Sequence, residues 1–537
     1  MHLNYASTIE QMADRLVDSP CLFYGEKTLT WKQYDDRGSR IARALSEAGL
    51  KKDSKVGLFL YNCCEYMEST LAAYKLRAIP ININYRYVGD ELAYLLNDCG
   101  AEAIVFHSSL GDVVAEIRDK VSTLKLLISV NDEGELIDGA EEYEHLITST
   151  EPAERIERSA EDLLMLYTGG TTGMPKGVEY KIGEMLGQMV QMSPMYFGNE
   201  LPVSVNDLLA QAEQRAKDKG YFVSLPASPL MHTAGILNSG MFVQVLGGAM
   251  VILTSRSFDP SELWQAVQDH HVQHMVVVGD TFVKPMLRAL EEDRDNGIEY
   301  DLSSFRTMIS SGVIFSQESK LKLLELADMM ILDVVGATEG GMAIQMSNRS
   351  SPPTETASFV AMETTEIFDE GYNMLPRGCG KPGFIGMGGT LPQGYYKDEA
   401  KTAKTFRTID GQRWGFTGDM GTIESDGTLT FLGRGSGCIN TGGEKVYPEE
   451  VEEAVKKHPS IADCLVVGLP DDRFGERIAA VVSLKGLMEN PTEELMEFCT
   501  AHLARYKLPR SVKVVDKVER LPNGKANYKW AKSCFAS

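Results

Sequence analysis

The sequence lacks several features that would place the protein in a specialised class. Only nine of its 537 residues are cysteine, their number is odd, and none forms a CxxC pair. We therefore expect reduced thiols rather than a disulfide framework. No stretch approaches the roughly 20 apolar residues of a transmembrane helix. The first residues, MHLNYASTIEQMADRL, contain neither the basic nor the apolar region of a secretory signal. These absences predict a cytoplasmic protein without stable membrane insertion.

Positive charge is also scarce. Lys and Arg number 53 against 76 Asp and Glu, which gives a formal net charge of −23. Because no basic excess is available to displace counterions from a phosphate backbone, the composition argues against nucleic-acid binding. Anionic small molecules are not excluded, since a pocket can be locally positive. The hydrophobic fraction of 43% is enough for more than one core, so a disordered chain is excluded.

Short apolar runs alternate with amphipathic segments over most of the chain. This alternation predicts α/β layers with largely parallel sheets. Strands are expected at residues 55–61, 104–106, 126–130, 163–167, 249–254 and 274–278, and helices at 34–48 and 260–269. Many glycine-containing turns between residues 376 and 445 predict short strands and hairpins, and a small β-barrel-like subdomain is expected in the N-terminal domain. The last hundred residues predict a compact α+β unit, with a helix at 449–458, strands at 461–468 and 477–484, and a helix at 492–503.

The predicted domain boundary lies in the glycine-rich stretch 433–437. We expect a large N-terminal domain at residues 1–434 and a small C-terminal domain at residues 435–537. The boundary falls where short turn-rich strands give way to the α+β pattern.

Residues 163–179 read LLMLYTGGTTGMPKGVE, an apolar strand that runs directly into a loop suited to bind a polyphosphate. Its glycines leave backbone N–H groups bare, its threonines add hydroxyl donors and its lysine adds a cation. The residues concerned are Thr168, Gly169, Gly170, Thr171, Thr172, Gly173 and Lys176. A Walker A loop is excluded, because there Gly-Lys is followed by Ser or Thr. Here Lys176 precedes its glycine, and Met174–Pro175 stands where a helix should begin.

With this loop, the sequence resembles the adenylate-forming superfamily, which includes acyl-CoA synthetases, luciferases and adenylation domains. Six further motifs occur in the order that this superfamily shows. They are PLMHTAG at 229–235, GATE at 336–339, TGD at 417–419, Gly-Arg at 433–434, GGEKVYPEEV at 442–451 and PNGK at 522–525. Each motif alone would be weak, but their joint order is specific.

The resemblance implies a two-step reaction with ATP, Mg²⁺ and CoA. A carboxylate attacks the α-phosphorus of ATP to give an acyl-adenylate and pyrophosphate, and a CoA thiol then displaces AMP. The loop would hold the β- and γ-phosphates, Thr338 would contact the α-phosphate, and Glu339 would bind Mg²⁺. Asp419 would accept both ribose hydroxyls, and Arg434 would bind the same side of the nucleotide.

The remaining roles follow from the same resemblance. Lys525 would place its ammonium between the substrate carboxylate and the α-phosphate, and His232 would line the acyl channel near that carboxylate. Gly437 would be the hinge about which the small domain swings between the two steps. The other assigned positions are Gly336 for the nucleotide, Gly312 and Val313 for the acyl pocket, and Gly442, Gly443 and Glu444 for the CoA face.

The sequence departs from the family pattern at several positions. Val335 stands where an aromatic residue would stack on adenine. The Thr-His or Ser-His pair expected after the loop is absent from residues 178–181. Ser436 and Gly437 replace the usual Lys-Asp of the hinge. Because glycine has the freest backbone, we expect domain alternation to persist with less bias toward either state.

Two other patterns leave alternatives open. His270, His271 and His274 suggest a metal site by their spacing, but no HExxH glutamate or cysteine partner is nearby. A methionine series follows the loop at positions 185, 189, 192 and 195. It indicates either core packing or a pliable wall for a bulky apolar acyl group.

The substrate implied by the resemblance is a fatty acid or a bulky apolar acid such as a steroid side chain. An adenylation enzyme that passes the acyl group to a carrier-protein thiol or an amine is the alternative within enzymes. A non-catalytic nucleotide-binding regulator is a remote alternative, against which the joint presence of Lys176, Glu339, Asp419, Arg434 and Lys525 argues. The oligomeric state is left open, a homodimer included.

Overall fold

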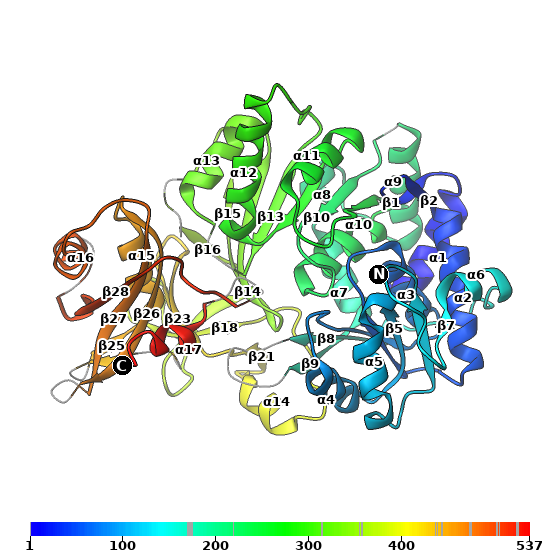
Figure 1. Ribbon diagram of the computed structural model, residues 1–537, viewed down its shortest axis with the longest axis horizontal. Coiled ribbons are helices and arrows are strands. Elements are labelled where there is room, and N and C mark those ends of the chain that lie inside the picture. Colours follow the sequence, from blue (N-terminus) through cyan, green and yellow to red (C-terminus); the bar gives the residue numbers. More distant parts are fainter. Residues whose placement is uncertain are drawn as a thin grey trace. The chain divides into compact units, whose positions relative to one another are not determined.

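The fold is seen in a computed structural model, shown in Figure 1. It describes residues 2–168, 175–218, 220–312, 315–353, 355, 358–434, 437, 439–441, 444–471, 475–500, 503, 505–521 and 526–536. Contacts divide the chain into two compact units. The first comprises Met1–Gly340, Met346–Thr356 and Gly389–Phe406, and the second comprises Gly341–Gln345, Ala357–Gly388 and Arg407–Ser537. The predicted boundary between residues 434 and 435 remains a prediction.

The first unit is built around a mostly parallel sheet. Its strand order is β2 (Lys27–Thr30), β1 (Pro20–Tyr24), β11 (Ala249–Ile252), β10 (Val223–Pro226), β12 (His274–Val277), β13 (Thr307–Ser311) and β14 (Met330–Ala337). All neighbours pair in parallel except β1 and β2. Strands such as β12 are buried at every residue, as expected where both faces of a parallel sheet are covered.

A second parallel sheet in the same unit has the order β4 (Ile79–Asn82), β3 (Lys55–Phe59), β5 (Ala101–His107), β6 (Leu126–Val130) and β7 (Glu141–Glu142). The chain leaves β3 toward β4 on one side and later continues through β5 to β7 on the other. In doubly wound folds, ligand sites lie beyond the carboxyl ends of the strands at such a reversal.

A small antiparallel sheet completes the first unit. Its strand order is β19 (Gly394–Tyr395), β9 (Lys176–Lys181) and β8 (Leu163–Thr168). The two strands β8 and β9 form a hairpin whose ends Thr168 and Lys176 are paired.

Helices cover the sheets of the first unit. They are α1 (Tyr5–Arg15), α2 (Trp31–Glu47), α3 (Cys64–Lys75), α4 (Gly89–Cys99), α5 (Gly111–Ile117), α6 (Tyr143–Ser149), α7 (Ile182–Gln191), α8 (Ser193–Phe197), α9 (Val205–Lys217), α10 (Phe242–Val245), α11 (Pro260–Asp269), α12 (Gly279–Asp295), α13 (Gln317–Leu326) and α14 (Glu399–Thr405). A π-helix, Ala234–Met241, precedes α10. Among the described residues, 3₁₀ turns lie at Ser108–Leu110, Arg118–Lys120 and, in the second unit, Arg505–Lys507.

Local sequence explains where these helices begin. Thr30 and Gln33 form a reciprocal capping box at the start of α2, with bonds of 3.2 and 2.8 Å between side chain and backbone. This cap starts α2 at Trp31, three residues before the predicted start. Asp259 caps α11 and Pro260 takes its first position. The predicted bounds of that helix are the observed ones.

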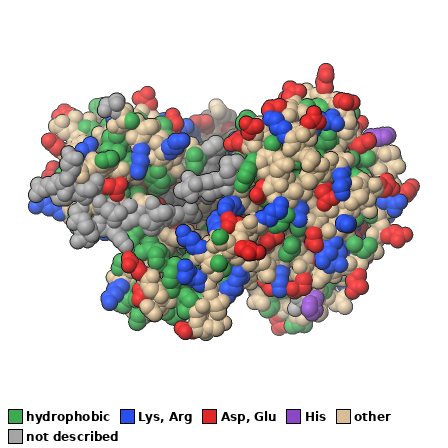
Figure 2. Space-filling view, turned by 90° about the horizontal axis from the view of Figure 1, so that it is seen from below, with side chains coloured by type: hydrophobic (Ala, Val, Ile, Leu, Met, Phe, Trp, Pro, Cys, Tyr) green, Lys and Arg blue, Asp and Glu red, His purple; other side chains and the backbone are tan. Residues whose placement is uncertain are grey.

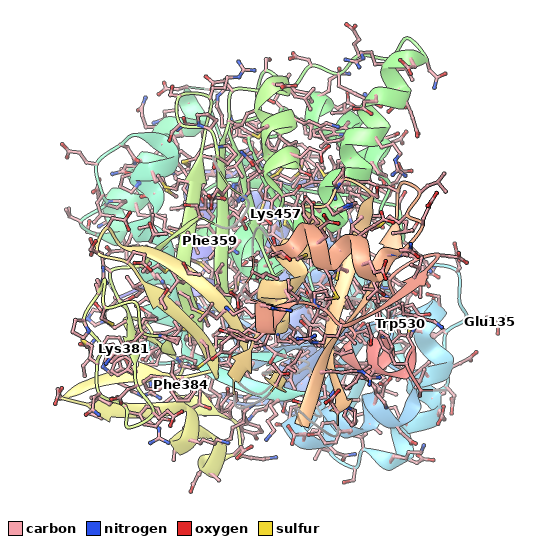
Figure 3. All side chains as sticks on the ribbon, turned by 90° about the vertical axis from the view of Figure 1, so that its left-hand side faces the viewer. Glu135, Phe359, Lys381, Phe384, Lys457 and Trp530 are labelled. Atoms are coloured by element: carbon pink, nitrogen blue, oxygen red, sulfur yellow. The ribbon has the colours of Figure 1, made fainter. Side chains whose placement is uncertain are left out.

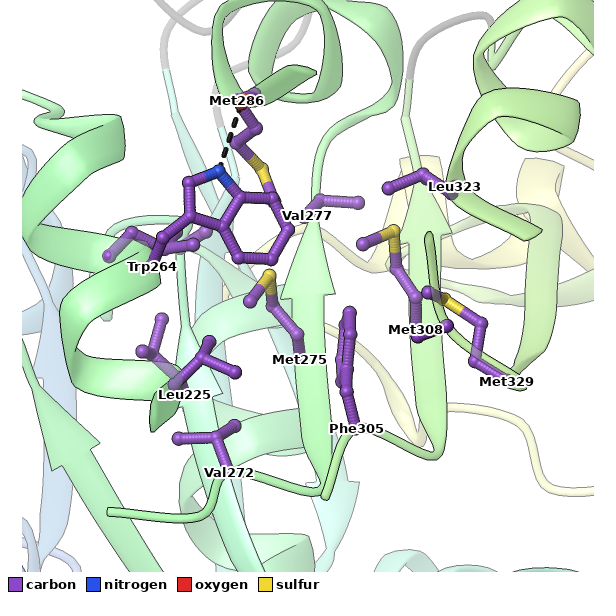
Figure 4. Packing of buried hydrophobic residues seen from close by; sticks show 14 of the residues in the cluster. Leu225, Trp264, Val272, Met275, Val277, Met286, Phe305, Met308, Leu323 and Met329 are labelled. Atoms are coloured by element: carbon purple, nitrogen blue, oxygen red, sulfur yellow. Dashed lines mark hydrogen bonds between the residues drawn. The ribbon is translucent and has the colours of Figure 1, made fainter. Parts of the chain in front are cut away.

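One hydrophobic core of the first unit lies between α11, α12, α13 and one face of the main sheet (Figure 1 and Figure 4). Trp264 and Phe305 are fully buried there, with ring centroids 6.4 Å apart. The indole N–H of Trp264 donates to the carbonyl oxygen of Met286 over 2.9 Å, so this buried polar group is satisfied. The core fixes β10 to β14, whose carboxyl ends carry several predicted site residues.

The second unit contains an antiparallel sheet that corresponds to the predicted β-rich subdomain. Its order is β15 (Gly340–Ser347), β16 (Phe359–Ala361), β23 (Thr428–Arg434), β22 (Asp419–Ile423), β18 (Gly383–Met387), β21 (Gln412–Gly415) and β20 (Phe406–Ile409), and β17 (Thr365–Phe368) also pairs with β18. Figure 3 labels Phe359 on β16 and Phe384 on β18.

The remainder of the second unit is the predicted α+β fold. One sheet has the order β25 (Glu444–Val446), β24 (Ile439–Thr441), β27 (Gly475–Leu484) and β26 (Ile461–Asp471), and β28 (Ser511–Val515) pairs in parallel with β27. The helices are α15 (Pro448–Lys456), α16 (Pro491–Thr500) and α17 (Tyr528–Ser533), the last carrying Trp530 in Figure 3. The predicted fold class is therefore confirmed, with α/β layers in the first unit and a β-rich part and an α+β part in the second.

The structure also describes the state of the cysteines, the character of the helices and the distribution of surface charge. The eight described cysteines are free thiols and most are buried. Among the described residues, no helix combines the length and the apolar character that crossing a membrane would require. On the face drawn in Figure 2, Lys and Arg side chains lie among Asp and Glu side chains.

Candidate functional site

The predicted phosphate-binding loop is the connection of the β8–β9 hairpin. Thr168 and Lys176 are cross-strand partners, so the two ends of the loop are held side by side. The loop residues Gly169, Gly170, Thr171, Thr172 and Gly173 lie outside the described part of the chain. A strand follows the loop, whereas a helix would follow a Walker A loop. The structure therefore agrees with the exclusion made from the sequence.

Lys176 has an acidic partner that the sequence did not indicate. Its ammonium pairs with Asp398, which also caps α14 by accepting from the backbone N–H of Lys401 over 2.9 Å. These contacts hold the pKa of the Asp398 carboxyl below its usual range, the lysine contributing most. The lysine is thus positioned at the base of the loop by a fixed carboxylate.

Thr338 and Glu339 form the turn between β14 and β15. Two tyrosines of the small antiparallel sheet hold this turn. The hydroxyl of Tyr180 on β9 donates to the carbonyl oxygen of Thr338 over 2.7 Å. The hydroxyl of Tyr395 on β19 donates to Glu339 Oε1 over 2.5 Å. Because β19, β9 and β8 are neighbours, this sheet brings the loop base and the Thr338–Glu339 turn together.

The segment that carries His232 is held by two asparagines at the carboxyl edge of the second parallel sheet. Asn82 Nδ2 donates to the carbonyl oxygens of Met231 (2.7 Å) and Tyr167 (2.9 Å), and Asn82 Oδ1 accepts from the Tyr167 N–H (2.8 Å). Asn62 Oδ1 accepts from the N–H of Leu230 over 2.8 Å. Asn82 therefore ties the residue before Thr168 to the residue before His232.

The predicted acyl segment begins at the carboxyl end of β13. Gly312 has φ +92°, a left-handed conformation that L side chains rarely adopt, and this explains the glycine. Val313 lies outside the described residues. Beneath this segment Lys320 and Asp333 form a buried ion pair at 2.6 Å. Burial raises the pKa of Asp333 to about 6 and lowers that of Lys320.

Predicted residues of the second unit are described separately. Asp419 opens β22, is 4% exposed, and accepts from the hydroxyl of Thr417 over 2.5 Å. Gly433 has φ +96°, a left-handed conformation that favours glycine, and a Cβ there would also require Glu449 Oε2 to move from its position 2.0 Å away. The backbone of Arg434 closes β23 in register with Asp419, while its side chain and that of Glu444 lie outside the described part. Gly437 has open space around a Cβ.

Three more predicted residues, Gly442, Gly443 and Lys525, lie outside the described residues. The segment that contains Lys525 is flanked by Arg520 and Ala526, which form an isolated antiparallel bridge. Arg520 is anchored to β26 by a bidentate pair with Asp463, with bonds of 2.8 and 2.7 Å. Both ends of the segment are therefore fixed to the sheet.

Of the three histidines, His274 is fully buried and structural. Its ring nitrogens bond Thr307 Oγ1 (2.8 Å) and the Asn238 carbonyl oxygen (3.3 Å), and burial lowers its pKa to about 4. No group of His, Cys, Asp or Glu that could hold a metal is found among the described residues. Of the four methionines, Met189 is buried, Met185 and Met192 are partly buried, and Met195 is 37% exposed.

The positioning residues Asn82, Asp398, Tyr180 and Tyr395 were missed from the sequence. Their contacts join positions 56 to 222 residues apart, beyond the reach of any local pattern. The motif residues, by contrast, could be recognised from their order along the sequence.

Comparisons with known proteins agree with this geometry. A model of the AMP-binding enzyme family matches residues 9–396, and a model of the AMP-binding enzyme C-terminal domain matches residues 450–525. A 3-oxocholest-4-en-26-oate–CoA ligase of Rhodococcus rhodochrous is 38% identical over 99% of this chain and 96% of its own. A medium/long-chain-fatty-acid–CoA/3-oxocholest-4-en-26-oate–CoA ligase of Mycolicibacterium smegmatis is 38% identical with the same coverage.

Solved structures show the same fold at lower identity. An anthranilate CoA ligase in complex with anthranoyl-AMP superimposes with a TM-score of 0.81 at 21% identity, covering 99% of this chain and 97% of its own. ATP-bound MatB from Rhodopseudomonas palustris gives a TM-score of 0.81 at 23% identity and 99% coverage of both chains. The family model matches residues 9–396, and a relative is 38% identical over 99% of this chain. The chain therefore belongs to the AMP-binding enzyme family.

Proposed function

We propose that the protein is an AMP-forming acyl-CoA ligase. It activates a carboxylic acid with ATP to an acyl-adenylate and then transfers the acyl group to CoA, releasing AMP and pyrophosphate. The observation that carries the proposal is the small antiparallel sheet, which gathers the loop base, Lys176 and the Thr338–Glu339 turn. Full-length relatives named as CoA ligases support the same reaction.

The first step brings a carboxylate and a polyphosphate together, so positive charge must offset their repulsion. Lys176 and the backbone N–H groups of the loop would hold the β- and γ-phosphates. The donor set suits Mg²⁺, because one carboxylate and a neighbouring hydroxyl leave sites for phosphate oxygens and water. Glu339 would hold the ion with Tyr395 orienting its carboxylate, and the bound ion would supply further positive charge.

The remaining residues of the first step act on the nucleotide and the acid. Asp419 would accept the ribose hydroxyls, and Arg434 would bind beside it. Lys525 would donate to the attacking carboxylate and the α-phosphate as negative charge moves between them. In the second step the CoA thiolate attacks the acyl carbonyl carbon, the carbon–oxygen bond to AMP breaks, and AMP leaves with the electron pair.

The proposed substrate is a fatty acid or a bulky apolar acid of the steroid side-chain type. The segment after Gly312 is apolar in sequence, and the partly buried Met185 and the buried Met189 lie on α7, which follows the loop strands. The names of the relatives support this class of acid. A cytoplasmic location completes the proposal, and the oligomeric state, a homodimer included, is left open.

An acid panel with ATP, Mg²⁺ and CoA tests the function directly. We expect AMP, pyrophosphate and thioester in equal amounts with long apolar acids. Release of ADP would exclude the AMP-forming mechanism. If adducts form with amines or carrier-protein thiols and no acid yields a CoA thioester, the acyl acceptor is an amine or a carrier-protein thiol instead of CoA.

Glu339→Gln tests the metal role. The amide keeps the size of the side chain but removes the charge that attracts a divalent cation. We expect the Mg²⁺ concentration for half-maximal pyrophosphate exchange to rise by about tenfold or more, and Tyr395→Phe to produce a smaller rise. Glu318→Gln on α13, at an exposed position, is the matched control. A magnesium titration identical to the wild type would refute the ligand role.

Asn82→Asp tests the tie between the loop strand and the His232 segment. The variant keeps one acceptor, loses both donors and places a negative charge against two carbonyl oxygens. We expect the rate of ATP–pyrophosphate exchange to fall about tenfold, because small displacements of reacting groups reduce rates strongly. Asn97→Asp is matched, since Asn97 Nδ2 also donates to two carbonyl oxygens, those of Ala93 and Lys120. Equal exchange rates in the two variants would show that Asn82 has no positioning role.

A further inference from the structure

Lys401, in the first turn of α14, lies one contact away from the carboxylate to which the proposed function assigns the metal. Its ammonium is 3.8 Å from the ring centroid of Tyr395, and the hydroxyl of that ring donates to Glu339 Oε1 over 2.5 Å. Its backbone N–H donates over 2.9 Å to Asp398, the partner of Lys176. The proposed reaction involves each of these neighbours but gives Lys401 itself no role.

The backbone of Tyr395 is already fixed by two elements. Its N–H donates to Thr402 Oγ1 over 2.9 Å, and Thr402 Oγ1 donates to the carbonyl oxygen of Asp398 over 2.8 Å. In addition, β19 pairs with β9 through Gly394 and Tyr395. These contacts fix where the side chain begins, but the position of its hydroxyl also depends on the two torsion angles of the side chain.

The ammonium of Lys401 acts on the part of Tyr395 that the backbone leaves adjustable. A cation over the face of a phenol is attracted by the negative charge of the π-system. The distance of 3.8 Å is shorter than the 5.1 and 4.8 Å at which Lys55 and Lys397 approach the ring of Tyr396. Such a cation limits rotation of the ring and draws electron density from the phenol oxygen, so the hydroxyl becomes a stronger donor to a carboxylate.

The orientation of Glu339 depends on this hydroxyl. Tyr395 holds Oε1, which leaves Oε2 as the oxygen that can face a divalent cation. Groups that hydrogen-bond a metal ligand fix its orientation, and their loss commonly reduces metal affinity or activity. The chain of contacts therefore runs from the ammonium of Lys401 through the phenol to the carboxylate.

We infer that Lys401 is a positioning residue for Glu339, and that it acts through the ring and the hydroxyl of Tyr395 rather than by touching ATP or the metal. The inference rests on the proposed function and adds to it a residue that lies outside every motif by which the sequence indicated the site. Its helix would thus support two groups of the site, since Asp398 at the start of α14 holds Lys176.

A double-mutant cycle on the full-length enzyme tests the inference. The four proteins are the wild type, Lys401→Met, Tyr395→Phe and the double variant. Phenylalanine keeps the ring over which the ammonium lies and removes only the hydroxyl, so a lysine that acts through the hydroxyl has no effect in that background. The readout is kcat of ATP–pyrophosphate exchange at saturating Mg²⁺, because the ammonium also repels the ion and its loss would change Mg²⁺ affinity in the opposite direction.

We expect Lys401→Met to lower kcat about threefold to tenfold in the wild-type background, the range of a partly desolvated cation–ring contact, with the KM for ATP within about twofold. In the Tyr395→Phe background the same change should alter kcat by less than about 1.5-fold. Lys401→Arg should restore at least half of the wild-type kcat, since a guanidinium also binds ring faces. Lys404→Met, at an exposed position of the same helix, is the control and should keep the wild-type kcat.

Three outcomes would overturn the inference. An equal loss of kcat in both backgrounds would show that Lys401 acts independently of the Tyr395 hydroxyl. A raised KM for ATP with unchanged kcat would show that the lysine binds phosphate itself, and a Lys401→Arg variant as slow as Lys401→Met would exclude a role of its charge. Failure of the proposed function would look different, since the wild type itself would then release ADP or show no pyrophosphate exchange with any acid.

Discussion

Lys525→Ala should abolish the first half-reaction and spare the second. We expect ATP–pyrophosphate exchange to fall about 10³-fold, because a group that stabilises developing charge in a water-poor site contributes on that scale. Thioester formation from a supplied acyl-adenylate should stay within about twofold of the wild type, since no phosphorus chemistry remains to be done. The two assays on one purified variant separate the steps.

The surroundings of this segment make the experiment clean. Arg520 and Ala526 are bridged, and Arg520 is anchored on β26, so the flanks do not depend on the lysine itself. Tyr528 and Trp530 pack against the same sheet. Loss of the ammonium should therefore leave the fold of this part unchanged.

Lys529→Ala is the matched control for this variant. It is the same change four residues further on, at an exposed position of α17, and both half-reactions should remain normal. Full pyrophosphate exchange in Lys525→Ala would refute the role assigned to this lysine.

Lys320→Met should be the most destabilising change in the described core. The ammonium is fully buried and lies 2.6 Å from Asp333, which is itself 5% exposed. Without its partner, Asp333 must either remain charged in a poorly solvated place or bind a proton. Removing one member of such a pair costs about 3–5 kcal/mol in the free energy of unfolding. Chemical denaturation of the purified protein measures this difference.

The partner variants distinguish loss of the pair from loss of a long side chain. Lys322→Met changes an exposed lysine of the same helix, 3.7 Å from Glu318, and should cost less than about 1 kcal/mol. The double variant Lys320→Met with Asp333→Leu should recover more than half of the loss, because no unpaired charge remains. A double variant as unstable as the single one would show that packing, not charge, determines the cost.

Much of the fold could be predicted because each cue was local. The run at residues 126–130 is apolar except for Ser129, as is typical of a parallel strand covered on both faces, and it is β6 without a change of bounds. Asp259 followed by Pro260 marked the start of α11. The family prediction is confirmed by the matches over residues 9–396 and 450–525. Its ordered motifs could be read without any knowledge of their contacts.

What could not be predicted depends on contacts between distant residues. Asn82 lies in a stretch that reads simply as a buried strand, yet its amide joins residues 85 and 149 positions away. Asp398 had no motif to mark it, and its pairing with Lys176 joins residues 222 positions apart. Burial of Lys320 beside Asp333 was equally hidden, because both residue types are usually exposed.

The pairing of Lys176 with Asp398 changes how ATP affinity should be understood. If this lysine holds a phosphate, it does so by exchanging partners, since the carboxylate must release the ammonium that it contacts now. The observed affinity would then report a difference between two ion pairs. Added salt weakens both of them, so ATP binding should respond to ionic strength less steeply than a free lysine would predict. An acidic protein could in this way bind a highly charged nucleotide with little dependence on the surrounding electrolyte.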